Sequence, residues 1–471
     1  MDAKDRLIEE QGRLIAELRR EIEQLKIALA KAKKDSSNSS KSPSSDIAKP
    51  PKKCAGGNGA RKKRKRGGQP GRRRKLRQPL PPDRVDEAYV HELTDAEVHR
   101  RGLTPIDQFE IVQHIELLDL PIHVTEHRLR KYLTPEGRTV VTQAPELRGQ
   151  PIFGPRMLAM IGWLKSRAHC SYTTIADWMG DVLGVPVCRG YLAKLCNGRI
   201  SASLAPAYDE LRSAIPEQET LGSDETCVKN NGQKQWAWCV TAPRFTVFHI
   251  AASRGRAVLE ELIGGDYDGH VHLDYFSSNC SFAWNFDVKA QYCWAHLIRD
   301  IRFLEKHPNK RARAWADRLL DRTKRMFSAW HGREEMSKEG RRRSFVMHRD
   351  KFLAIVRKPP DVSDAQNISA RFAEVELEDG GCYDMSQDYF RFLFASGVEP
   401  TNNHTEQQVR HCVIDRRITQ GTRSAVGQRY HERMWTAIAT CAKQGRGFFA
   451  YLHQAIDAEL SGSSPISLLD A

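Results

Sequence analysis

The chain has 471 residues, a formal net charge of +15 at pH 7 and 40% hydrophobic residues, which favours two to four folded units over one small domain. No apolar run approaches the roughly 18 residues that a membrane-spanning helix needs. The N-terminus mixes acids and bases from its second residue, which is not the pattern of a secretory signal. We therefore expect a cytoplasmic protein with no membrane partner.

The eleven cysteines are scattered along the chain, and no C-x-x-C pair occurs. Such a pattern favours free thiols over a disulfide framework. It also argues against a four-thiolate zinc site, so we expect no zinc.

Positive charge is concentrated in one segment, Lys49–Arg77, which we call the basic arm. It contains fourteen Lys and Arg residues and no acid, so it carries almost all of the net charge. A cationic arm suits the phosphate backbone of DNA, where each neutralised phosphate releases counterions. A solvated tail or an RNA-binding tail would have the same composition. The expected DNA contacts in the arm are Arg61, Lys62, Lys63, Arg64, Arg66, Arg72, Arg73 and Arg74.

Residues 1–34 have the pattern of a short coiled coil. Apolar residues recur every seven positions at Ile8, Ile15, Ile22 and Leu29, with Leu18 and Leu25 between them. A helix of this length is marginally stable alone. The pattern therefore predicts pairing with further copies of the chain, as a homodimer or a higher oligomer. The alternative is one amphipathic helix packed on its own protein.

Three segments connect this helix to the largest domain. Residues 35–85 are rich in Ser, Pro, Gly, Lys and Arg, which predicts a disordered linker. Residues 86–150 alternate apolar and polar residues in short runs, which predicts a small β-rich module. Residues 151–205 contain three helical patterns with Gly184-Val185-Pro186 before the third. This outline is typical of a helix-turn-helix DNA-binding module, and equally of any small helical bundle.

The pattern of residues 215–455 predicts an α/β domain with a mixed sheet, followed by a tail at 456–471. Three antiparallel strands, a helix and then alternating strands and helices is the order of a ribonuclease H-like fold. The expected strands are Leu221–Val228, Gln235–Thr241, Thr246–Ala251, Val271–Leu273 and Gln291–Trp294, and the expected helices are Arg256–Ile263 and Ala295–Glu305.

Two acids lie on strands that this order places side by side. Asp224 lies in the first strand and Asp274 ends the fourth, and because these strands are expected to be neighbours, the carboxylates should converge at one edge of the sheet. A third acid is expected from a later helix. Glu406 follows Thr401 and Asn402, either of which is a suitable N-cap. The chain has 59 acids, so strand order alone leaves other choices open.

Three converging carboxylates suit phosphodiester cleavage. Two Mg²⁺ ions about 3.5–4 Å apart stabilise both the attacking and the leaving oxygen of an in-line displacement. Mg²⁺ prefers oxygen ligands, and no nucleophilic side chain is required. The sequence thus predicts Asp224, Asp274 and Glu406 as catalytic and metal-binding residues, with two Mg²⁺ ions per site and Mn²⁺ as a substitute.

Several blocks of the sequence occur in the order found in a known family. They are the serine-rich Asp35–Asp46, Gly67-Gly68-Gln69-Pro70-Gly71, the helical 153–196, Ser223–Thr226 with Trp236 and Trp238, Leu273–Ser277, Cys293–His296 with Arg299 and Asp300, and Asn402–Glu406 with Val409, Arg410, Arg416 and Arg417. Together they resemble the transposases of the insertion sequence 66 family, of the DDE class, over nearly the whole chain. The resemblance implies that Asp224, Asp274 and Glu406 are the catalytic triad, and that Arg410, Arg416 and Arg417 contact DNA. It also implies element-encoded accessory proteins as partners.

The same resemblance accounts for the long separation of Asp274 from Glu406, because it implies an inserted, mainly helical segment at about 306–395. Two features depart from the family. The region 100–150 contains no cysteine where a cysteine-based zinc finger is usual, and Tyr275-Phe276 stands where a Gly-Tyr pair is more usual.

Cys293 and His296 make half of a metal site. A structural pair at a strand-to-helix junction is the favoured interpretation, and contact of His296 with substrate DNA is the alternative.

The sequence therefore predicts a transposase that binds terminal inverted repeats in double-stranded DNA. It would cleave a strand at each element end and join the 3′-hydroxyl to target DNA, associating with the bacterial nucleoid when bound. The alternatives are an inactive or repurposed transposase that only binds DNA, and a nuclease that resolves DNA or RNA structures.

Overall fold

The computed structural model describes residues 3–32, 80–90, 94–101, 113, 121–133, 135, 139–141, 151–376 and 382–469. The chain divides into two units, one of Met1–Pro51, Leu129–Asp181 and Val185–Ala471, and one of Lys52–Arg128 and Val182–Gly184. The predicted DNA contacts from Arg61 to Arg74 lie outside the described residues. None of the described helices is both long and apolar enough to cross a membrane.

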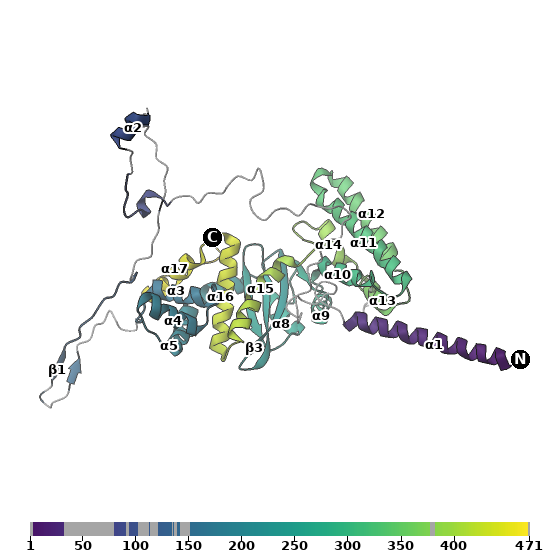
Figure 1. The fold of residues 1–471 in the computed structure, drawn as a ribbon, viewed down its shortest axis with the longest axis horizontal. Helices are drawn as coiled ribbons and strands as arrows, with labels where there is room; N and C mark the ends of the chain where they lie inside the picture. Colours follow the sequence, from purple (N-terminus) through teal and green to yellow (C-terminus); the bar gives the residue numbers. More distant parts are fainter. Residues whose placement is uncertain are drawn as a thin grey trace. The chain divides into compact units, whose positions relative to one another are not determined.

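The N-terminal segment forms one long helix, α1 (Ala3–Ala32), as the heptad pattern predicts (Figure 1). Six large apolar side chains of this helix are exposed: Leu14, Ile15, Leu18, Ile22, Leu25 and Leu29, with Ile15 and Ile22 each at 50%. A stripe of this kind is what pairing would bury, and the pairing itself stays a prediction.

The described part of residues 80–141 contains four short elements. They are a 3-10 turn η2 (Pro82–Arg84), a helix α2 (Asp95–Arg101), and the strands β1 (Lys131–Leu133) and β2 (Thr139–Val141). The two strands pair antiparallel, with Tyr132 opposite Val140. Most of the predicted β-rich module, including nearly all of 102–120, lies outside the described residues.

The three helical patterns before the sheet correspond to α3 (Pro155–Ser166), α4 (Tyr172–Leu183) and α5 (Arg189–Leu195). Pro155 occupies the first turn of α3, where its missing N–H costs no hydrogen bond. A π-helical turn (Cys196–Ile200), α6 (Ser201–Ser203) and α7 (Ala205–Ser213) follow. Leu158 and Ile161 of α3 belong to the same buried core as Val271 of the sheet, so these helices form one body with it.

A five-stranded mixed sheet forms the centre of the largest unit. Its strands are β3 (Thr220–Asn230), β4 (Gln233–Thr241), β5 (Thr246–Ala251), β6 (His270–Leu273) and β7 (Lys289–Tyr292), in the order β5-β4-β3-β6-β7. The β3–β4 and β4–β5 pairs are antiparallel, whereas β3–β6 and β6–β7 are parallel. The predicted neighbourhood of the first and fourth strands is therefore confirmed.

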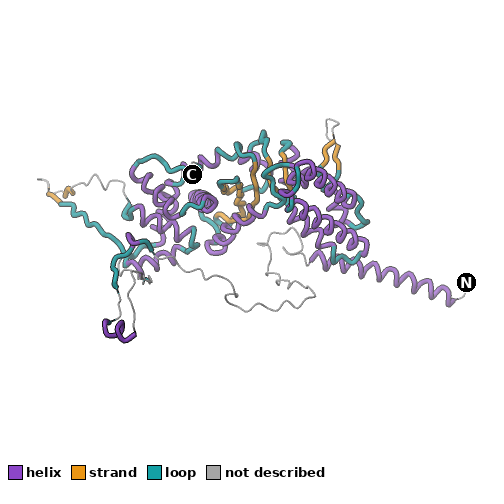
Figure 2. Tube along the Cα trace, turned by 90° about the horizontal axis from the view of Figure 1, so that it is seen from above, coloured by secondary structure: helices purple, strands orange, loops and turns teal. Residues whose placement is uncertain are grey.

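Helices connect and cover the strands (Figure 2). The first is α8 (Arg256–Ile263), in the crossover to β6, and its bounds agree with the prediction. The second is α9 (Ser277–Asn285), which was not predicted. The third is α10 (Trp294–Leu304), which follows β7 and leads into the long segment before Glu406.

The segment between α10 and Glu406 is mainly helical, as predicted for 306–395. It contains α11 (Lys310–His331), the 3-10 turn η5 (Arg333–Glu335), α12 (Lys338–Val356), α13 (Ser363–Ala370), the short strands β8 (Glu374–Glu376) and β9 (Cys382–Asp384), and α14 (Gln387–Phe394). Trp294 of α10 packs edge-on against Phe352 of α12 and Phe390 of α14, which anchors the insertion to the start of α10.

Three helices complete the unit: α15 (Asn403–Thr419), α16 (Ala425–Gln444) and α17 (Phe448–Ser461). α17 runs across the boundary predicted between the domain and the tail. Leu468, beyond that helix, is 1% exposed. The last described residues are thus packed into the body rather than trailing from it.

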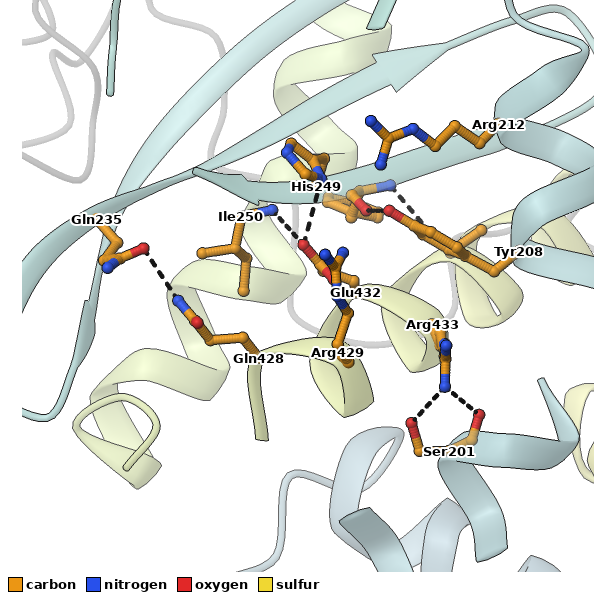
Figure 3. Close-up of polar contacts among 12 residues, drawn as sticks. Ser201, Tyr208, Arg212, Gln235, His249, Ile250, Gln428, Arg429, Glu432 and Arg433 are labelled. Carbon is orange, nitrogen blue, oxygen red and sulfur yellow. Dashed lines mark hydrogen bonds and ion pairs between the residues drawn. The ribbon is translucent and has the colours of Figure 1, made fainter. Parts of the chain in front are cut away.

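One side of α16 provides hydrogen-bond acceptors for backbone N–H groups of the edge strand β5. Glu432, Thr436 and Thr440 are spaced four residues apart on α16 and accept the backbone N–H groups of Ile250, Phe248 and Thr246, at 2.6, 3.0 and 3.2 Å. An unpaired sheet edge would leave these donors without partners. Figure 3 shows Glu432 between Ile250 and His249 of β5 and Arg429 of its own helix.

This edge gives a first prediction. Thr436→Val removes the hydroxyl that accepts the Phe248 N–H, leaving a buried donor unpaired, so we expect the free energy of unfolding to fall by about 1–3 kcal/mol. Denaturant titration measures it. The matched control is Thr323→Val. The Thr323 hydroxyl only donates to the carbonyl of Leu319 in the same helix. Its removal leaves no buried donor without a partner and should lower the free energy of unfolding by less than about 1 kcal/mol. Equal losses in both variants would contradict the edge pairing.

Candidate active site

Asp224 and Asp274 project from two adjacent parallel strands. Gly222 of β3 pairs with His272 of β6, and each acid lies two residues further along its strand direction. Burial raises the pKa of Asp224 well above its usual range, and the negative charges of Asp274, Glu225 and Glu406 raise it further. The three predicted acids therefore lie close enough to repel one another.

The loop before α15 fixes the start of the helix that carries Glu406. The amide Nδ2 of Asn402 donates to the carbonyl of Ser223 at 2.7 Å, and its backbone N–H donates to Cys293 Sγ at 3.3 Å. The backbone N–H of Trp294 donates to Pro400 at 2.9 Å. Asn402 occupies the N-cap position, as predicted, but its side chain bonds the sheet and makes no cap bond to the helix.

A glycine in β3 lets α15 approach the sheet closely. A Cβ on Gly222 would lie 2.2 Å from Thr405 Oγ1, 2.8 Å from Thr241 Oγ1 and 3.0 Å from Asn402 Oδ1. Thr405 and Thr241 also bond each other through their hydroxyls at 2.8 Å. No larger residue fits at Gly222 without a shift of the side chains around it, and two of these belong to residues at the start of α15, the helix that bears Glu406.

His296 lies between two of the three acids. Its Nδ1 is 2.8 Å from Asp274 Oδ1, and its Nε2 is 3.8 Å from Glu406 Oε1. Burial lowers its pKa, but hydrogen bonding with Asp274 and Cys293 outweighs burial and raises the pKa to about 10. Asp274, Cys293, His296 and Glu406 each offer a ligand atom within 4.8 Å of the others. His296 thus belongs to the acid cluster, although Cys293 also has the structural contact with Asn402 described above.

Arg299, one turn after His296 on α10, also reaches this cluster. Its guanidinium lies 3.9 Å from Glu406 Oε1. Only the motif Cys293–His296 with Arg299 behind it marked this residue in the sequence. The contact itself depends on how α10 and α15 pack, and spacing along the chain does not show it.

The acids suit divalent cations. Asp274 Oδ1 and Glu406 Oε1 are buried, and the side chains of His296 and Arg299 lie 2.8 to 3.9 Å from them. The two acids keep 30% and 24% exposure, so the cluster opens to the surface. Carboxylates that repel one another are stabilised by a hard cation, and carboxylate oxygens are what Mg²⁺ prefers. The residues present therefore fit the predicted metal.

A cation–aromatic stack flanks Asp224 on β3. Arg254 pairs with Glu225, with 2.7 Å between Arg254 Nε and Glu225 Oε1. Its guanidinium lies 3.7 Å from the ring centre of Phe276 and 4.7 Å from that of Trp236. Phe276 is one of the two residues that depart from the family pattern, and this stack gives it a packing role beside the site.

The predicted arginines on α15 differ in their surroundings. Arg410 and Arg417 are exposed. Arg416 donates to Thr226 Oγ1 at 2.8 Å and to the carbonyl of Cys227 at 2.5 Å. Its guanidinium therefore holds α15 against β3, a structural contact that the sequence did not predict.

Comparison with known protein families gives one match. A model described as Transposase IS66 family matches residues 150–430, more than half of the chain, which includes the sheet, the helical insertion and all three acids. No curated protein sequence matches the chain. Because this match covers more than half of its length, the chain belongs to the IS66 transposase family.

Proposed function

We propose that this protein is a DDE-type transposase whose ribonuclease H-like domain cuts and joins DNA with Asp224, Asp274 and Glu406. The observation that carries the proposal is the convergence of these acids from β3, from the end of β6 and from α15, beside a strand order with β3 between β4 and β6. That order agrees with the fold inferred from the sequence. Family membership supports the nucleotidyl-transfer chemistry.

The three carboxylates would hold two Mg²⁺ ions, with Mn²⁺ as a substitute. When bound, the ions supply charge stabilisation for the attacking and leaving oxygens of phosphodiester cleavage. The protein contributes fixed ligands. Asn402 and the close approach at Gly222 hold α15, so that Glu406 stays near Asp224 and Asp274. Arg299 lies 3.9 Å from Glu406 and His296 lies 2.8 Å from Asp274, so both side chains would offset part of the negative charge of the cluster.

The reaction needs no covalent intermediate with the protein. Water attacks the phosphorus at the element end, the P–O3′ bond breaks, and the leaving oxygen takes a proton to become a 3′-hydroxyl. That hydroxyl then attacks a phosphorus of target DNA, which forms a new phosphodiester and releases a 3′-hydroxyl of the target. Each step exchanges one P–O bond for another.

DNA binding and assembly are assigned to the parts outside the sheet. The basic arm, exposed Arg410 and Arg417, and the helical segment α3–α5 would bind terminal inverted repeats and target DNA. The exposed apolar stripe of α1 would pair copies of the chain as a dimer or higher oligomer. Element-encoded accessory proteins are further proposed partners, with the cytoplasm and the nucleoid as the place of action.

The test incubates the purified full chain with Mg²⁺ and a labelled element end. Wild type should nick the end and join it to target DNA. Glu406→Gln keeps the size of the side chain but removes its charge, and should lower both rates by at least about 10²-fold, the cost of losing one group that stabilises transition-state charge. The matched control is Glu399→Gln, at an exposed glutamate just before α15, which should leave both rates near wild type.

Other outcomes point to other functions. Nicking of branched or hairpin substrates without joining would make the protein a nuclease. Binding to element ends without any Mg²⁺-dependent cut would make it a DNA-binding protein derived from a transposase. Equal rates for wild type and Glu406→Gln would overturn the site.

A further inference from the structure

A second group of metal-ligating side chains lies on α15, away from the three acids. His411 and Asp415 are four residues apart and so share one face of the helix. His169 joins them from the turn between α3 and α4. One ligand atom from each of these three residues lies within 4.8 Å of the others. Asp415 is nine residues after Glu406, which is about 13.5 Å along a helix axis, so the group is separate from the catalytic cluster.

Asp415 is the centre of this group and is 1% exposed. Its Oδ1 lies 2.6 Å from His169 Nδ1, and its Oδ2 accepts from Trp435 Nε1 at 2.6 Å. His431 Nδ1 is 3.7 Å from the same Oδ2. The hydrogen bond from Trp435 therefore fixes the orientation of the Asp415 carboxylate.

His411 has the features of a prepared ligand. Its Nε2 is buried and has no hydrogen-bond partner. A buried ring nitrogen without a partner is free to bind a metal ion.

His169 is held in place at a cost in backbone energy. Its φ of 57° is in the left-handed region, which non-glycine residues rarely occupy. Its ring centre lies 4.3 Å from that of His411. The turn between α3 and α4 therefore adopts an unfavourable conformation that brings the two imidazoles together above Asp415.

We propose that His169, His411 and Asp415 bind one Zn²⁺ ion, with water in the fourth position. Two imidazoles and one carboxylate suit zinc, whereas Mg²⁺ prefers an all-oxygen set. The ion would fasten the α3–α4 turn to α15, the helix that carries Glu406. It would thereby connect the helical segment before the sheet to the catalytic cluster. Unlike a zinc finger, this site needs no cysteine, so the absence of C-x-x-C pairs does not exclude it.

Co²⁺ replaces Zn²⁺ as a visible probe in the test. Metal-free full-length protein should take up one equivalent of Co²⁺ with the absorption of a four-coordinate site, and Zn²⁺ should displace it. His411→Gln should lose that equivalent. His296→Gln is the matched control, since it removes a histidine from the catalytic cluster; it should keep the absorption. The readout is metal uptake, so it does not depend on whether the protein cuts DNA.

A second variant keeps the test decisive if His411→Gln fails to fold, which circular dichroism will show. Trp435→Phe retains all three ligands but removes the hydrogen bond to Asp415 Oδ2, so Co²⁺ affinity should fall about 10–100-fold. The proposal is wrong if wild type takes up no four-coordinate Co²⁺. It is also wrong if His411→Gln and Trp435→Phe both bind Co²⁺ as wild type does, because the His169–Asp415 contact is then only an ion pair.

Discussion

Asp224→Asn is expected to abolish strand cutting and joining while making the metal-free protein more stable. Asp224 is buried beside Asp274, Glu225 and Glu406, and both burial and these charges raise its pKa. Its negative charge therefore opposes folding in the absence of a cation. Asparagine removes the charge at nearly constant volume. Activity should fall by at least about 10³-fold, because a group that binds the transition-state charge is lost.

The expected gain in stability can be measured without DNA. In metal-free buffer at neutral pH, we expect the melting temperature of Asp224→Asn to exceed that of wild type by at least about 2 °C. A carboxyl whose folded pKa is raised binds its proton more tightly when folded, so wild type gains stability as pH falls through that pKa. The difference should therefore shrink at acidic pH. Mg²⁺ should raise the melting temperature of wild type and not that of the variant.

The matched control for this prediction is Asp268→Asn. Asp268 is an exposed acid just before β6 that pairs with Lys289. Its replacement should leave activity near wild type and should not raise stability. If Asp224→Asn instead destabilises the metal-free protein, the carboxylate is satisfied by the protein itself, and the interpretation of the cluster as a cation site is wrong.

Gly222→Ala should have the second largest effect, on both stability and activity. The added Cβ would lie 2.2 Å from Thr405 Oγ1, and a β-carbon is not tolerated so close to another atom. Overpacking of this kind costs about 1–3 kcal/mol. Thr405 directly precedes Glu406, so we expect the collision to displace Glu406, and a misplacement of about 1 Å can lower a rate about 10²-fold. Denaturant titration and the joining assay measure the two effects.

A second substitution tests whether the loss of stability in Gly222→Ala comes from the clash between the added Cβ and Thr405. Thr405→Ala removes the nearest atom, so Gly222→Ala combined with Thr405→Ala should lose less stability than the sum of the two single changes. Gly180→Ala serves as the control, because nothing lies within 4 Å of its added Cβ. It lies inside α4, where alanine is the better helix former, so it should not destabilise. Strict additivity of the double variant would argue against a collision at Thr405.

The order of strands and the place of two acids follow from local pattern. Alternating apolar residues and turn signals define β3, β4 and β5, and the prediction that β3 and β6 are neighbours is confirmed by the pairing of Gly222 with His272. α9 was missed because its sequence, Ser277–Asn285, has little periodic apolar character for a helix. Phe282 and Ala283 of this helix are buried in the core.

The rest of the site depends on contacts between residues far apart in the sequence. The positions of His296 and Arg299 near Glu406 require the starts of α10 and α15 to lie close together, and the motif around Cys293 gives no sign of it. Arg416 was predicted to contact DNA because it is basic and lies in a family block. In the fold it also donates to the carbonyl of Cys227 in β3, a contact that only the folded arrangement reveals. Its contact with DNA stays a prediction.

The contact between α16 and β5 has a consequence for how the enzyme can be shortened. A fragment that ends soon after Glu406 would contain all three acids but would lack Glu432, Thr436 and Thr440. The amides of Thr246, Phe248 and Ile250 would then face solvent along a bare strand. Such a strand recruits another chain, so the fragment should aggregate rather than react. The smallest soluble catalytic fragment therefore has to extend past Thr440.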